Sequence, residues 1–171
     1  MLNWRRKKAM DRDTLVDLFK ILGARNPGDW AKSQAEENIP QIARFLFLRQ
    51  AWKLVVADGD ESWIQTESAL SATAPGGAIG LALKRLVAQG VSMEDLITVV
   101  RVMQWRLLSG ICYLLDDPGT VEDKVKDIAW RLFQVGEDDA PVALIGGLYE
   151  SVLDLDPSGQ EMRQDGGRRI P

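Results

Sequence analysis

Histidine is absent from the 171 residues, and there is a single cysteine, Cys112. Without histidine the chain cannot build a Ser-His-Asp or Cys-His catalytic set, a histidine-ligated zinc or haem site, or an imidazole pH switch. One thiol cannot form an internal disulfide or a cysteine zinc cluster. These absences exclude common catalytic and metal-binding arrangements, and the single cysteine fits a cytoplasmic protein best.

Long uninterrupted hydrophobic runs are also missing. The basic residues 5–8 are followed by Asp11 and further charges, where a signal peptide would have an apolar core. The longest apolar stretch, residues 96–115, contains Arg101 and Arg106. A membrane span tolerates central arginines poorly, at roughly 2.5–3.5 kcal/mol each. We therefore expect a protein with no membrane association.

The charges that are present are unevenly distributed along the chain. The net charge is −4, but residues 1–25 hold seven basic and three acidic residues, whereas residues 116–165 hold four basic and thirteen acidic ones. Nucleic acid is not an expected partner, because the four consecutive basic residues form a weak patch and the rest of the chain repels phosphate. The acidic C-terminal third is either a solvated surface or a surface for a basic protein partner.

Apolar residues recur mostly with helical spacing, and no alternation of strands and helices indicates a doubly wound nucleotide fold. The segment near residues 93–115 is apolar nearly all round, as in a helix surrounded by others. We predict an all-α fold, a compact multi-helix bundle of about seven helices around this central hydrophobic helix. The predicted helices are residues 13–23, 30–37, 40–57, 61–70, 79–90, 93–115 and 121–134.

Residues 132–150 allow two interpretations. A helix opened by Pro141 fits the apolar spacing, although Gly146 and Gly147 in its middle would cost roughly 0.8–1 kcal/mol each relative to alanine. A small β-hairpin near residues 132–145 is the alternative. In either case we expect a single helical domain over residues 1–156, followed by a loosely ordered C-terminal tail over residues 157–171, which contains few apolar residues.

We expect the charged groups of the apolar helices to find their partners within the protein itself. Arg44 and Arg101 lie on the two most hydrophobic predicted helices, and a buried arginine needs a carboxylate partner, which the protein itself can provide. Cys112 lies in the apolar run of residues 111–115, so we expect a buried, unreactive thiol.

Residues 154–165 resemble a calcium-binding loop, with oxygen donors at Asp154, Asp156 and Ser158 followed by Gly159. Three features oppose this interpretation. Glu161 occupies the place of an apolar residue, the last acid is an aspartate, and no helix is predicted to follow. We expect a capped turn here, and we assign no metal and no cofactor to the chain.

A second acidic cluster comprises Asp58, Asp60, Glu61 and Glu67. Paired carboxylates can perform acid–base chemistry or hold Mg²⁺ with a phosphorylated substrate. The paired helical motifs that such enzymes use are missing, however. The alternative is a helix end followed by acidic residues that favour the dipole of the next helix, and no residue is assigned as catalytic.

Two tryptophans are the candidate anchors for a protein partner. Trp30 and Trp63 lie near predicted helix starts, beside acidic residues, and an exposed tryptophan is a typical interface anchor. The other interpretation is that both close the ends of the core. With them we group the acidic residues Glu137, Asp138 and Asp139 as predicted partner-binding residues.

These patterns favour a non-enzymatic protein-interaction module, such as a regulator, adaptor or toxin-neutralising protein, that uses an acidic surface to bind a basic partner. A homo-oligomer is compatible with the same sequence. One alternative is a small-ligand-binding helical protein with a cavity between residues 40–57 and 93–115. The other is a Mg²⁺-dependent carboxylate enzyme that acts on a phosphorylated substrate.

Overall fold

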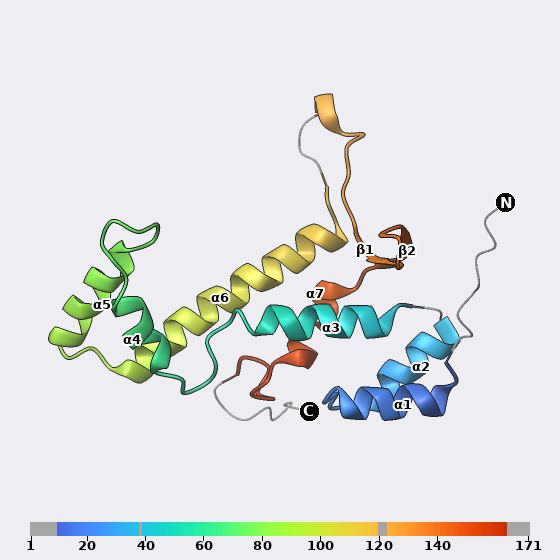
Figure 1. Ribbon diagram of the computed structural model, residues 1–171, viewed down its shortest axis with the longest axis horizontal. Helices are drawn as coiled ribbons and strands as arrows, with labels where there is room; N and C mark the ends of the chain where they lie inside the picture. The colour runs from blue at the N-terminus through green and yellow to red at the C-terminus, as the bar shows by residue number, and fades with distance from the viewer. Residues whose placement is uncertain (1–9, 38, 120–122, 164–171) are drawn as a thin grey trace. The chain divides into compact units, whose positions relative to one another are not determined.

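A computed structural model describes residues 10–37, 39–119 and 123–163, which form seven α-helices and a two-stranded antiparallel sheet (Figure 1). The mostly helical class is therefore confirmed. The chain divides into two compact units, Met1–Gln50 with Gly110–Leu155, and Ala51–Ser109 with Asp156–Pro171. Helices in the described residues lack the combination of length and apolar character needed to cross a bilayer.

In the first unit, α1 (Arg12–Ile21) packs against α2 (Pro27–Glu37), and α3 (Gln41–Trp52) follows. Asp11 caps α1, because its carboxylate accepts a hydrogen bond from the backbone N–H of Thr14 at 2.9 Å. This bond also lowers the pKa of Asp11. The helix predicted over residues 13–23 therefore begins one residue earlier, at Arg12. Gly23 ends the helix with a positive φ of 85°, as its position predicts.

The core of the first unit is an aromatic and aliphatic cluster at the junction of these three helices. Leu15, Phe19, Ala31 and Phe45 are buried in it, and Trp30 packs against them. The Trp30 ring lies edge-on to Phe45, with 5.3 Å between ring centroids, and 5.9 Å from Phe19. Aromatic pairs in this range contribute about 0.5–1.5 kcal/mol beyond the area they bury.

The helix predicted over residues 121–134 is wrong. The chain forms only a short 3₁₀ turn, η1 (Asp123–Val125), and is extended by β1 (Leu132–Val135). Val125 and Ile128 have helical spacing but remain exposed, and a short amphipathic helix is not stable without a surface on which to pack its apolar face. The start of the predicted helix, at residues 121 and 122, lies outside the described residues.

The hairpin alternative for residues 132–145 is confirmed, and the helix opened by Pro141 is wrong. The strand β2 (Pro141–Ile145) pairs with β1, and a short helix, α7 (Leu148–Ser151), and a 3₁₀ turn, η2 (Leu153–Leu155), follow. Gly147 has a positive φ of 68°, which a helix interior does not accommodate. The glycine pair therefore separates the strand from α7.

In the second unit, α4 (Ser62–Ser68) packs on α5 (Ala78–Ala88), and α6 (Met93–Asp116) follows, of which the residues up to Ser109 belong to this unit. Gly80 is required at this contact, because a Cβ there would lie 2.8 Å from the backbone oxygen of Glu67.

The helix α3 ends at Trp52, earlier than the predicted residue 57. The helix ends there because side chains of α6 form hydrogen bonds with the backbone N–H and carbonyl of Val56. Its N–H donates to Gln104 at 2.7 Å, and its carbonyl accepts from Arg101 at 2.7 Å. These bonds replace helical ones, and the turn between Trp52 and Val55 brings Val55 into the core.

The bundle predicted around the helix of residues 93–115 is not confirmed. One side of α6 is buried, at Ile97, Arg101 and Leu108, but large apolar residues on its other side are exposed. An apolar pattern all round a helix shows which surfaces favour burial, but it does not show what covers them.

Candidate functional site

The β1–β2 hairpin presents both its apolar side chains and its turn to solvent. Phe133 lies opposite Leu144 in the antiparallel register, and the pairing shifts between Gln134 and Val135. Phe133, Val135, Val142 and Leu144 are between 44 and 52% exposed. A two-stranded hairpin is marginally stable by itself and has two unpaired edges, so this exposed surface is open to a further chain.

The turn of this hairpin is acidic. Glu137, Asp138 and Asp139 are all exposed, and in the described part of the chain none of them forms an ion pair. The N–H of Gly136 donates to the carbonyl of Ala140 at 2.9 Å, and Asp139 has a positive φ of 57°. The hairpin therefore places the three predicted acidic residues in its turn, next to the exposed apolar side chains of its two strands.

The base of the hairpin is fixed at both ends. Before β1, the indole N–H of Trp130 donates to the carbonyl of Leu114 at 2.9 Å. After β2, Ile145 and Leu148 are buried, and the N–H of Tyr149 donates to the carboxylate of Asp116 at 2.8 Å. The exposed strands therefore project from an anchored base, and a site on a rigid base loses less entropy on binding.

Arg44 lies against the glycine that follows the hairpin. A Cβ on Gly147 would lie 2.7 Å from a terminal nitrogen of its guanidinium, so a larger residue there would displace the end of the Arg44 side chain and would also be strained by the positive φ. Burial lowers the pKa of Arg44, and the charges of Asp116, Glu150 and Glu37 oppose this effect. Its guanidinium also donates a long hydrogen bond of 3.5 Å to the hydroxyl of Ser151.

The two tryptophans predicted as anchors, Trp30 and Trp63, are both half-buried. Trp30 belongs to the aromatic cluster described above, so its contacts are those of a core residue. Trp63 is half-buried on α4, and its indole nitrogen is buried without a hydrogen-bond partner among the described residues. Trp30 thus packs in the core of its unit, whereas Phe133, on the strand that leads into the acidic turn, is 45% exposed.

The predicted carboxylate cluster stays dispersed. Asp60 accepts a hydrogen bond from the N–H of Ser62 at 2.9 Å at the start of α4, and hydrogen bonds from Ser62 lower its pKa. Asp58 and Glu61 are exposed, and Glu67 lies further along the helix. Across the residues described, His, Cys, Asp and Glu side chains do not form a group of three or more that could hold a metal ion.

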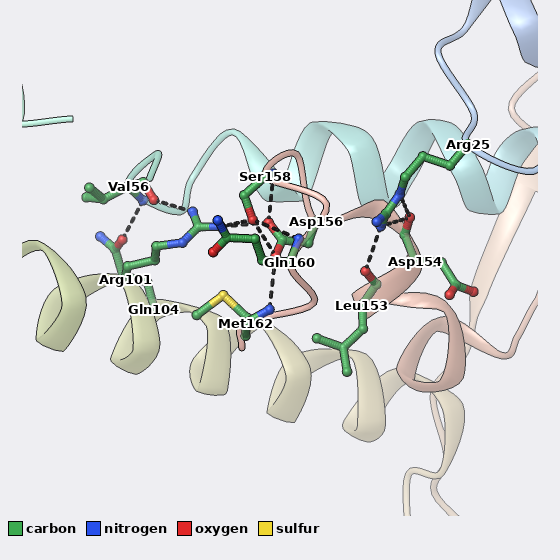
Figure 2. Close-up of polar contacts among 10 residues, drawn as sticks. All are labelled: Arg25, Val56, Arg101, Gln104, Leu153, Asp154, Asp156, Ser158, Gln160 and Met162. Carbon is green, nitrogen blue, oxygen red and sulfur yellow. Dashed lines mark hydrogen bonds and ion pairs between the residues drawn. The ribbon is translucent and has the colours of Figure 1, made fainter. Parts of the chain in front are cut away.

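The loop that resembles a calcium site is organised by an arginine instead (Figure 2). Asp156 forms an ion pair with Arg101 at 2.6 Å, and their side chains are 0% and 7% exposed. The Asp156 carboxylate also accepts hydrogen bonds from the N–H groups of Ser158 and Met162, both at 3.1 Å, and from the hydroxyl of Ser158 at 2.9 Å. The capped turn is confirmed, and both carboxylate oxygens are occupied.

Arg101 connects this loop to the chain that leaves α3. It donates to the carbonyl of Val56 and lies 5.6 Å from the centroid of the Trp52 ring. The guanidinium is therefore bound by a carboxylate, a carbonyl and an aromatic face, as a buried cation requires. The internal pairing predicted for Arg101 is confirmed. Residues 156–163 are held by these contacts, and the rest of the predicted loose tail lies outside the described residues.

Cys112 is fully buried, as predicted, and burial raises the pKa of its thiol to about 11, with a further contribution from the charge of Asp116. A pKa two units above the ordinary value of 9.0 lowers the thiolate fraction at pH 8 about 100-fold.

We therefore expect iodoacetamide to modify Cys112 in the native protein at least about 100-fold more slowly at pH 8 than in the denatured protein. The native rate should rise as the pH approaches 11. Mass spectrometry of timed, quenched samples measures both rates. Equal rates in the native and denatured protein would contradict the buried position of this thiol.

No protein-family model matches the chain, and neither a curated protein nor a solved structure shows significant similarity to it.

Proposed function

We propose that this protein is a non-enzymatic interaction module that binds a protein partner through its β1–β2 hairpin. The observation that supports this proposal is the exposure of Phe133, Val135, Val142 and Leu144 beside the three carboxylates of the turn. Exposed apolar surface rimmed by charge is typical of protein-binding sites. The cytoplasm is the location we propose, because the chain has one cysteine and that thiol is free and buried.

The side chains of the hairpin indicate which kinds of residue the partner would present. Apolar side chains of the hairpin would be covered by apolar groups of the partner, which supplies most of the binding free energy. The carboxylates of Glu137, Asp138 and Asp139 favour lysine and arginine beside that apolar contact. Such charges mainly raise the association rate and select the partner, so the rate should fall as salt is added.

The test is a comparison of immobilised variants in native lysate at low salt. Phe133→Ser combined with Leu144→Ser removes the apolar contact, and Ile21→Ser, at a residue of the same unit that is 82% exposed, is the matched control. We expect at least one protein to be retained by the wild type and the control but reduced about tenfold or more on the double variant. Equal retention on all three surfaces would contradict the proposal.

A second variant tests the role of the charges. Glu137→Gln, Asp138→Asn and Asp139→Asn together keep the shape of the turn, because asparagine tolerates the positive φ of residue 139. This triple variant should bind the same protein more weakly at low salt and lose most of the salt dependence. An unchanged salt dependence would show that these carboxylates do not face the partner.

A further inference from the structure

The outer side of α6 carries a second apolar surface, which lies within the second unit. Leu96, Val100, Met103 and Leu107 are spaced by four, three and four residues, which is the spacing of a coiled-coil seam. Met103 and Leu107 are 60% and 66% exposed, and Leu96 and Val100 are half-buried. Val99, beside them, is 60% exposed.

Two opposite charges lie along the same flank of this seam. Asp95 and Arg106 are both exposed, and in the described residues neither forms an ion pair. They are eleven residues apart, which at 3.6 residues per turn is about three turns, or roughly 16 Å along the helix. This arrangement is self-complementary. In a second copy that runs antiparallel, the positive charge lies beside the negative charge of the first copy, and the negative charge lies beside the positive one.

We infer that the outer side of α6 binds a second copy of this chain, with the two α6 helices antiparallel about a two-fold axis near residues 101 and 102. In this register Val100 of one copy faces Met103 of the other, and Leu96 faces Leu107, so every seam residue meets an apolar partner. Asp95 of one copy then lies within about one helical turn of Arg106 of the other, twice in the dimer.

Sedimentation velocity over a range of protein concentrations tests the association. The four layers of apolar contact, which are two distinct pairs that each occur twice, are few for a stable interface, so we expect dimerisation at concentrations on the order of 100 µM. Met103→Asp should abolish it, whereas Leu54→Asp, at an exposed residue of the same unit, should leave it unchanged. A wild-type monomer throughout this range would overturn the inference.

Charge reversal tests the orientation. Arg106→Asp places a second carboxylate opposite Asp95, and Asp95→Arg places a second cation opposite Arg106. Each single change should weaken dimerisation about tenfold, because both copies of the contact are affected, and the double exchange should restore it to within about threefold. Thermal melts show which variants remain folded. Weakening by the single changes without recovery in the double exchange would contradict the antiparallel register.

Cross-linking gives an independent measure of the same geometry. When the single variants Asp95→Cys and Arg106→Cys are mixed under mild oxidation, the disulfide that joins the two different variants should dominate. Disulfides that join two copies of Asp95→Cys would indicate parallel helices and overturn the inference. Cys112 does not interfere, since it is fully buried.

Discussion

Replacing Asp156 with alanine is expected to lower the free energy of unfolding by about 3–5 kcal/mol, because it leaves the guanidinium of Arg101 buried without its carboxylate. It also removes the acceptor for the N–H groups of Ser158 and Met162. For a domain with total stability of about 5–15 kcal/mol this is a large fraction. Urea unfolding followed by circular dichroism measures the change.

Two further variants test whether the loss of stability comes from the buried ion pair. Asp58→Ala removes an exposed carboxylate of the same unit and should change stability by no more than about 0.5 kcal/mol. Arg101→Met combined with Asp156→Leu removes both charges and should recover part of the loss, because apolar groups of similar volume often replace a buried ion pair at little cost. If Asp156→Ala behaved like Asp58→Ala, the ion pair would not organise this loop.

Replacing Trp30 with alanine is expected to lower the free energy of unfolding by about 2–4 kcal/mol. The indole packs against Phe19 and Phe45, and removing a large aromatic side chain from a core costs about 3–5 kcal/mol when it is fully buried. Trp30 is only partly buried, so the expected loss is about 1 kcal/mol below that range. Chemical denaturation followed by circular dichroism gives the value.

This variant also separates a core role from an interface role. Below its melting temperature, Trp30→Ala should retain the partner that the hairpin captures, since Trp30 lies in the helical core and not on the hairpin. Ile21→Ala, at an exposed residue of the same unit, should leave stability nearly unchanged. Loss of the partner by a folded, stable Trp30→Ala protein would assign this tryptophan to the interface.

The helices with a strong apolar period were predictable from the sequence. The structure has α5 and α6 within one or two residues of the predicted ranges, because their periodicity and end signals agree. The segment near residue 128 has the same period but no helix. Its apolar side chains find no packing surface, and that property depends on the tertiary structure and not on local spacing.

The candidate site was predictable only in part. The acidic turn was identified by its composition, but the apolar residues beside it were assigned to a helix or to an alternative hairpin. Phe133 and Leu144 come together only through the pairing of β1 with β2. The partner of Arg101 was equally hidden, because Asp156 is distant in the sequence and its local pattern resembles a metal-binding loop.

The most direct test of the proposed function is amide hydrogen exchange of this protein with and without the partner identified by the comparison of variants. Peptides covering residues 132–145 are expected to exchange more slowly in the complex, with the largest change in β1 and β2, whose outer edges pair with no further strand among the described residues. Unchanged exchange in the hairpin, with protection confined to other parts of the chain, would contradict it.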